Sequence, residues 1–111
     1  MSSLLTYDSL LYLAPGRKEK IEFDFVDEIP AGDSIKAVGA GTAVTAVSSE
    51  GTPFPSIISQ VVIDGTKLRA TISNITEGRD YLVTYTIQAE ISGEQFDKYL
   101  VVRARTRGLY L

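Results

Sequence analysis

The sequence predicts an all-β protein, an antiparallel β-sandwich of about seven strands. Apolar and polar side chains alternate in short runs along most of the chain, and Gly, Pro, Asp and Ser cluster between the runs. No stretch of the body shows the sustained period of roughly 3.6 residues that marks a helix. A small closed barrel is the alternative arrangement for the same strands. With 111 residues the chain has the size of one domain, large enough to bury a core without metal or disulfide support.

The chain begins with an apolar segment, residues 1–16, which the sequence predicts as an N-terminal arm ending at a Pro-Gly turn. Its apolar spacing fits both a strand and a short helix. We expect the arm either to fold back on its own domain as an extra edge strand, or to lie on a neighbouring subunit, by strand addition or in a groove. In both cases it carries too much apolar surface to remain in water. Its large apolar residues are Leu4, Leu5, Tyr7, Leu10, Leu11, Tyr12 and Leu13.

The sandwich itself is expected over residues 17–107. Its first strand alternates apolar and acidic residues in the run IEFDF, residues 21–25. Further strands are expected at 35–38 and 43–47. In the run 57–63 apolar residues occur at both odd and even positions, as in a strand that is covered on both faces.

The second half of the sandwich contains the clearest strand signals. Asp64-Gly65 predicts a type I′ hairpin turn into the run 67–72, because both residues tolerate a positive φ. The strictest alternation covers residues 81–91 and ends at Ser92-Gly93, which turns the chain into a last strand at 96–106.

The composition excludes several classes of function. A net charge of −3 and a pI near 4.8 provide no basic field for a phosphate backbone, so no nucleic-acid partner is expected. The absence of cysteine excludes thiolate catalysis, zinc–thiolate sites and disulfides. No Lys or Arg precedes the first apolar run and Asp8 interrupts it, which argues against a signal peptide. No apolar stretch reaches the roughly 20 residues of a membrane helix. We therefore expect a soluble protein made in the cytoplasm, with no membrane partner.

Catalytic and metal chemistry find little support in the sequence. Without His or Cys, neither a Ser–His–Asp nor a Cys–His arrangement can be built. The carboxylates are typical of solvated strand faces, and Gly39 and Gly41 are not followed by a helix or a Lys, as a phosphate loop would require. The segment DFVDE, residues 24–28, offers oxygen donors to calcium, but its spacing matches no defined loop. We expect no enzyme activity, no cofactor, no metal and no small-molecule ligand.

Three further features are candidates for partner contacts. Arg103 and Arg105 share one strand face, where they would either dock an acidic surface or prevent edge-to-edge pairing. Phe54 lies between two prolines in a loop, where it would either bind a partner at low entropic cost or cap the core. The C-terminal tail, residues 108–111, ends in Tyr110 and Leu111, which are unexpected on a terminus that meets only solvent.

Two stretches resemble known protein families. Residues 72–106 are similar to the end of an immunoglobulin-like or fibronectin-III-like domain, in which a Gly precedes a Tyr at the start of a long strand, followed by a hairpin and a final strand. Tyr81 takes the place of the tyrosine corner of such domains, while Phe23 and Phe25 would substitute for the missing core Trp. The run PGRKEKIEFDFVDEIPAGDSIKAV, residues 15–38, resembles a group of small tailed-phage virion proteins with a Pro-Gly turn, an FDF-type strand and a GD-S/T-I turn.

The phage resemblance extends over residues 15–106. It implies an immunoglobulin-like domain that attaches to a virus particle, decorating or cementing the capsid or forming part of the neck or tail, without enzyme activity. The implied partners are the major capsid protein or other virion subunits, the implied arrangement is a homo-oligomer or symmetric copies, and the implied location is the virion. The alternative is a recognition module for a host receptor or glycan, using Phe54, residues 39–42 and the Ser92-Gly93 turn. No sequence feature favours a third possibility, an inhibitor of a host enzyme.

Overall fold

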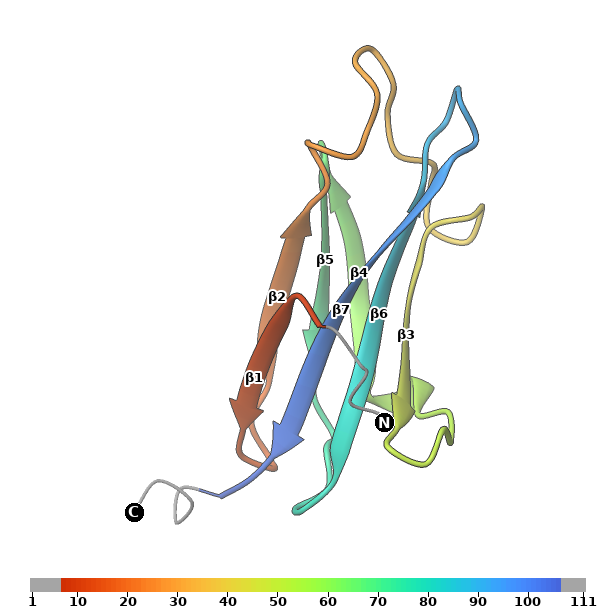
Figure 1. Ribbon diagram of the computed structural model, residues 1–111. Helices are drawn as coiled ribbons and strands as arrows, with labels where there is room; N and C mark the ends of the chain where they lie inside the picture. Colours follow the sequence, from red (N-terminus) through yellow and green to blue (C-terminus); the bar gives the residue numbers. More distant parts are fainter. Residues whose placement is uncertain (1–6, 107–111) are drawn as a thin grey trace.

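The computed structural model describes residues 7–106 as a β-sandwich of two facing sheets (Figure 1). One sheet has the strand order β1-β7-β6-β3 and the other has the order β2-β5-β4. The strands are β1 (Ser9–Leu13), β2 (Glu19–Asp24), β3 (Ala43–Ser48), β4 (Ile58–Asp64), β5 (Lys67–Ile72), β6 (Asp80–Gln88) and β7 (Gln95–Ala104), and a short 3-10 turn, η2 (Pro55–Ile57), precedes β4. The prediction of an all-β sandwich is confirmed, and the two separate sheets exclude the closed barrel.

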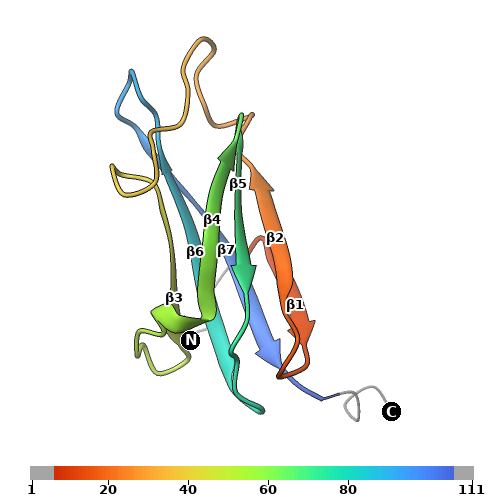
Figure 2. The same cartoon turned by 180° about the vertical axis from the view of Figure 1, so that it is seen from behind.

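The core lies between the two sheets, which Figure 2 shows from behind. Strand β6 buries every second side chain, as its alternating sequence predicts. The opposite sheet contributes the apolar face of β5, and Phe25, directly after β2, is fully buried. The fully buried large apolar and aromatic side chains are Phe25, Ile57, Leu68, Ile72, Tyr81, Val83, Tyr85, Ile87, Leu100 and Val102.

Two tyrosines of β6 combine core packing with hydrogen bonds. Tyr85 packs edge-on against Phe23, with ring centroids 4.7 Å apart, and its hydroxyl donates to the carbonyl oxygen of Ile21 on the other sheet at 2.9 Å. Burial raises the pKa of Tyr85 above its usual value of 10.0, because the charged form would lose its hydration. The Tyr81 hydroxyl accepts a hydrogen bond of 3.0 Å from the backbone N–H of Thr76, upstream on the chain.

The strand formed by the arm pairs in parallel with its neighbour. Strand β1 runs parallel to β7, with Ser9 opposite Leu100 and Leu13 opposite Ala104. The other strand pairs of the described region are antiparallel. The antiparallel arrangement predicted for residues 17–107 is therefore confirmed there, and the parallel strand belongs to the arm, whose direction was not predicted. The cause of the parallel direction is the turn after β1, closed by a hydrogen bond from the Arg17 N–H to the Ala14 carbonyl, which passes the chain to β2 in the other sheet.

The strand expected at residues 35–38 does not form. Ile35 makes only an isolated bridge to Ala89, and Val38 makes one to Thr42. The backbone turns at Gly39 and Gly41, whose φ values are 92° and 125°, so this segment cannot continue as an extended strand. It is part of the long connection between β2 and β3.

Strand β4 is not covered on two sides, as its apolar run suggested. It is an edge strand with a bulge, because the register against β5 shifts between Ser59 and Val62 and Gln60 has a φ of 51°. The inserted residue shifts the alternation, so that even-numbered side chains face the core before the bulge and odd-numbered ones after it. Ile58, Val61 and Ile63 therefore all pack against the core. A bulge therefore explains the apolar residues on both parities.

Both expected hairpins form, with shifted boundaries. Asp64 pairs with Lys67 at the end of the β4–β5 ladder, so the turn residues are Gly65 and Thr66. Of these two, only Gly65 has a positive φ, 65°, which is the pattern of a type II′ turn and not of the predicted type I′ turn. Strand β6 ends at Gln88, earlier than predicted, and Ile91 is 78% exposed where an inward position was expected.

Candidate partner-binding surface

Strand β1 carries four of the side chains that the sequence singled out for partner contact: Leu10, Leu11, Tyr12 and Leu13. Leu13 is only 6% exposed, and Leu11 packs against the core cluster. The neighbouring positions face outward: Leu10 is 38% exposed and Tyr12 is 43% exposed, and Tyr7 is exposed just before the strand. Of the two alternatives for the arm, its residues 9–13 thus adopt the edge strand of their own domain. Leu11 and Leu13 are core residues, while Tyr7, Leu10 and Tyr12 remain available to a partner.

Strand β1 is fixed to β7 at both ends. The Asp8 N–H donates to the Tyr99 carbonyl at 2.8 Å, and the Tyr99 N–H donates to Oδ2 of Asp8 at 2.7 Å. At the other end, the Arg105 N–H donates to the Leu13 carbonyl at 3.1 Å. The acidic residue that interrupts the apolar run therefore serves as a backbone anchor, a role that depends on a partner distant in the sequence.

The second edge of β1 is open. Because the Leu13 carbonyl points to β7, strand alternation directs the backbone groups of Leu10 and Tyr12 away from β7. Within residues 7–106, no other strand pairs with β1. An open edge of this kind presents unpaired N–H and C=O groups to any extended chain that approaches.

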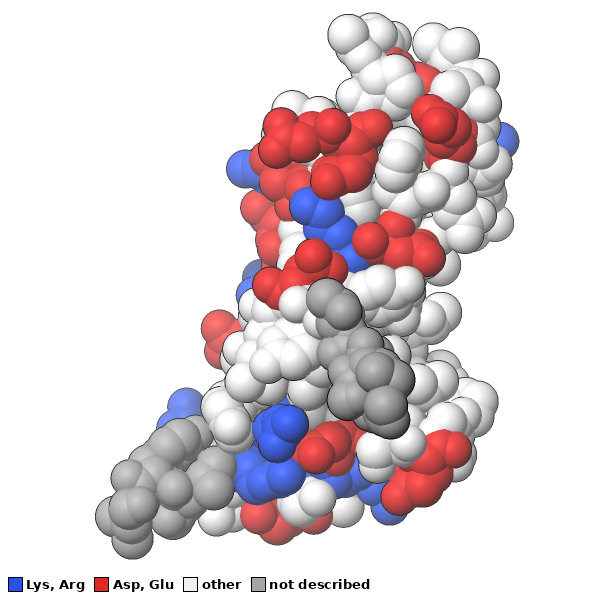
Figure 3. Space-filling model, in the orientation of Figure 1, with Lys and Arg blue, Asp and Glu red and all other residues white. Residues whose placement is uncertain are grey.

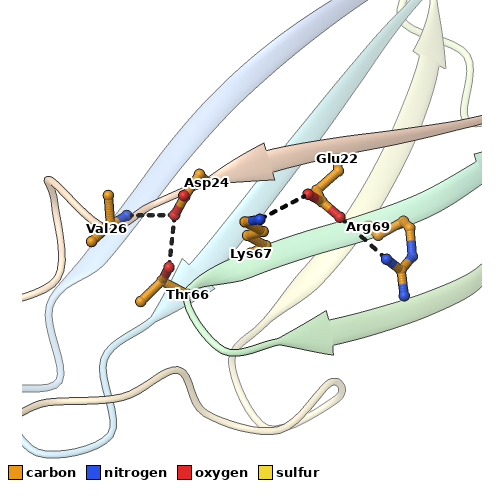
Figure 4. Close-up of polar contacts among 6 residues, drawn as sticks. All are labelled: Glu22, Asp24, Val26, Thr66, Lys67 and Arg69. Carbon is orange, nitrogen blue, oxygen red and sulfur yellow. Dashed lines mark hydrogen bonds and ion pairs between the residues drawn. The ribbon is translucent and has the colours of Figure 1, made fainter.

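The edge strand β2 is protected by charge (Figure 4). Its sequence is EKIEFD, and Glu22 forms ion pairs with Lys67 at 3.7 Å and with Arg69 at 3.2 Å. Asp24 accepts hydrogen bonds from the Thr66 hydroxyl at 2.7 Å and from the Val26 N–H at 3.0 Å. The Thr66 hydrogen bond is the main reason why the pKa of Asp24 lies below its usual value of 3.8. Charged side chains on an edge disfavour pairing with a foreign strand.

The edge strands β3 and β4 are protected in other ways. The segment after β3 folds along it, since the Ser48 N–H donates to Thr52 at 2.8 Å and the Phe54 N–H donates to Ala46 at 2.9 Å. In β4 the bulge at Gln60 interrupts the ladder. By contrast, β1 has the sequence SLLYL and a continuous register, with no charge, no proline and no bulge. It is the one edge of the described sandwich that lacks such a device.

The two arginines near the end of β7 have different environments. Arg105 forms an ion pair with Asp80, with Nη2 at 2.9 Å from Oδ1. Arg103 lies on β7, opposite Tyr12 of β1 on one side and opposite Asp80 of β6 on the other, so β1 separates it from the open edge. Figure 3 shows basic and acidic side chains together at this end of the molecule, whereas acidic side chains predominate toward the opposite, loop end.

Phe54 caps the end of the core. Its ring packs edge-on against Tyr81, with centroids 5.5 Å apart, and the Arg79 guanidinium lies over the ring, 4.7 Å from its centroid. Of the two roles weighed for this loop aromatic, the packing matches the structural one.

The loop end contains a feature that sequence reasoning missed. The Asp33 carboxylate accepts hydrogen bonds from the N–H groups of Ile91 at 2.8 Å and Ser92 at 2.9 Å, and from its neighbour Ser34 at 2.8 Å. Partial desolvation tends to raise the pKa of Asp33, but these N–H donors outweigh it and hold the pKa below 3.8. The carboxylate joins the β2–β3 connection to the β6–β7 loop, which displays Ile91. No local signal marks Asp33, because its partners lie far along the chain.

The last candidate from the sequence is the acidic segment DFVDE, residues 24–28. Glu28 of the DFVDE segment pairs with Lys98 at 3.5 Å, and residues 7–106 contain no group of three or more ligands suited to a metal ion. In the same range, no helix is long and apolar enough to cross a membrane.

Leu4, Leu5, Tyr110 and Leu111 lie outside the described residues. A scan against known protein families and a search of curated proteins both give no match for this chain.

Proposed function

We propose that the chain is a non-enzymatic structural protein of a tailed-phage particle, and that it binds neighbouring subunits through the exposed surface of β1. In this proposal the domain is immunoglobulin-like. It decorates or cements the capsid, or forms part of the neck or tail, and its partners are the major capsid protein or other virion subunits. Its location is the virion.

The order of the strands supports the immunoglobulin-like assignment. If β2 to β7 correspond to strands B to G of such a domain, the sheets become C-F-G and B-E-D, as in constant-type immunoglobulin domains. The hydrogen bond of Tyr81 back to Thr76 has the geometry of the tyrosine corner at the start of strand F. Strand β1 would then be a first strand placed beside G instead of B.

The observation that carries the structural role is the combination of exposed apolar side chains and an open backbone edge on one strand. Tyr7, Leu10 and Tyr12 are exposed, and the edge beside them has no protecting device. Contact with a neighbour would remove this apolar surface from water, at about 25 cal/mol per Å² buried. In a symmetric shell many such modest contacts act together. The binding element is therefore the outer side of a folded strand and does not need a free arm.

The test is quantitative mass spectrometry of particles purified through a density gradient from cells that carry the gene. The proposal predicts that peptides of this chain remain with the particles in a fixed ratio to the shell protein. Tyr12→Ser should lower this ratio, whereas Val62→Ser, at a similarly exposed position of β4, should leave it unchanged. Recovery of the chain only in the soluble fraction would refute the proposal. Immunogold labelling would then locate the protein on capsid, neck or tail.

One observation favours recognition of a host molecule as a second candidate function. The β6–β7 loop is held by the Asp33 carboxylate, so Ile91 is presented at little entropic cost. A labelled chain should then bind the host cells, and Ile91→Asp should reduce binding at least tenfold. Binding that is unaffected by this substitution, or no binding, would eliminate this candidate.

A further inference from the structure

We propose that two copies of the chain pair through their β1 edges. The two strands run antiparallel about a two-fold axis at Leu11, so that the two four-stranded sheets become one continuous sheet. A second copy of the chain would thus be the partner of the surface used in the proposed function. The pairing itself does not depend on that function, and only its role on a particle rests on it.

The backbone of β1 is prepared for this pairing. Leu10 and Tyr12 direct their N–H and C=O groups to the open edge, and these groups match those of another strand in the same conformation. The other described edges are charged, bulged or covered by a loop. Edge-to-edge association is therefore favoured at β1 over every other edge of the described sandwich.

The sequence of β1 is complementary to itself. When two copies run antiparallel, all residues of Ser9–Leu13 overlap only if the axis passes through Leu11. This register places Leu10 of one copy opposite Tyr12 of the other, and both residues direct their backbone groups to the shared edge. On the outer face it forms two Leu–Tyr cross-strand pairs, a combination of aliphatic and aromatic side chains that stabilises antiparallel pairs.

The charges beside β1 favour the same arrangement. Asp8 precedes the strand, whereas Arg17 and Lys18 follow it and Arg103 lies beside its second half. In an antiparallel pair the acidic beginning of each strand approaches the basic end of the other. A parallel pair would instead place the basic ends together, where like charges repel.

The first experiment measures the mass of the full chain by light scattering and its dissociation by analytical ultracentrifugation, over about 1 to 500 μM because small interfaces are weak. We expect a species of twice the 12.1 kDa monomer. Leu10→Lys should weaken the dimer at least tenfold. Val62→Lys is the matched control, because Val62 is 40% exposed and Leu10 is 38% exposed, and both belong to edge strands. A monomer at all concentrations, or equal weakening by both variants, would overturn the inference.

A mixing experiment tests the register. Leu10→Lys and Tyr12→Glu should each impair self-association, because each homodimer contains a charge opposite an apolar residue. When the two variants are mixed, the introduced Lys and Glu face each other across the axis, and a heterodimer should form at least tenfold more tightly than either homodimer. Circular dichroism establishes that both variants are folded. Folded variants that do not associate when mixed would overturn the proposed register.

The outcomes separate this inference from the proposed function. A chain that dimerises through β1 but is absent from purified particles leaves the inference intact and refutes the particle function. A chain that is bound to particles but remains monomeric in solution, with Leu10→Lys indistinguishable from Val62→Lys, supports the particle function and overturns the inference.

Discussion

Replacing Tyr85 by Phe removes one hydroxyl group from the centre of the sandwich and leaves the ring in place. The hydroxyl donates to the Ile21 carbonyl at 2.9 Å, and this hydrogen bond connects β6 to β2 in the other sheet. The edge-on packing of the ring on Phe23 does not involve the hydroxyl. Loss of the hydrogen bond at a mostly buried site should lower the free energy of unfolding by about 1–2 kcal/mol near neutral pH.

The dependence on pH gives a sharper test. Burial raises the pKa of Tyr85 in the folded protein above the usual 10.0, so the unfolded chain releases this proton first as the pH rises. Stability from this group is complete below pH 10.0 and is lost above it, at about 1.4 kcal/mol per pH unit. Tyr85→Phe lacks this loss. The advantage of the native protein over the variant should therefore fall by about 2 kcal/mol between pH 8 and about pH 11.5.

The assay is urea unfolding followed by circular dichroism, at several pH values, for the native chain and for Tyr85→Phe. The control is Tyr99→Phe, because Tyr99 faces outward on β7 and is opposite Thr84. We expect that variant to differ from the native chain by less than about 0.5 kcal/mol at neutral pH. A difference between the native chain and Tyr85→Phe that stays constant from pH 8 to about pH 11.5 would refute the assignment of a raised pKa.

Two further predictions concern β1 and the loop end. Leu13→Ala should lower the free energy of unfolding by about 2–3 kcal/mol because it empties a core position, whereas Leu10→Ala should cost less than about 1 kcal/mol, as measured by urea unfolding; equal costs would contradict the assigned faces of β1. Asp33→Ala should speed amide exchange at Ile91 and Ser92, measured by NMR with the amides of β6 as reference. Because the pKa of Asp33 lies below 3.8, the amides of Ile91 and Ser92 in the native chain should stay protected from exchange at pH 3.8 and lose this protection only at lower pH. Unchanged exchange in the variant would contradict the conclusion that the Asp33 carboxylate holds this loop.

The sequence predicted well the elements whose burial pattern is local. In β6 apolar residues alternate with more polar ones, which indicates directly that one face is buried and the other is more exposed. The buried face carries Tyr81, Val83, Tyr85 and Ile87. The hairpin into β5 was also predicted, since Asp64-Gly65 between two strand-like runs marks a reversal of the chain. These features need only neighbours a few residues away.

The predictions failed where a distant contact decides the local structure. At Gln60 the bulge reverses the parity of β4, which makes an edge strand resemble a doubly covered one. At Ile91 the strand pattern continues in the sequence, but the Asp33 carboxylate binds the backbone there and the ladder has already ended. The alternation of apolar and polar residues indicates which way side chains point. It does not indicate which backbone groups form hydrogen bonds with another segment.

The arm illustrates the same limit at the candidate site. The density of apolar residues in the arm indicates that part of it is buried, and it cannot say whether the buried face lies on the same chain or on a neighbour. The structure places Leu11 and Leu13 in the core and leaves Leu10 and Tyr12 outside, so the apolar residues divide between two uses. Folding needs one face of β1 and one of its edges, both satisfied within the domain. The outer side chains remain exposed and the second edge is unpaired within the described residues. An uncharged edge of this kind favours association. The simplest physical reason to keep Leu10 and Tyr12 apolar there is a second strand that pairs with them.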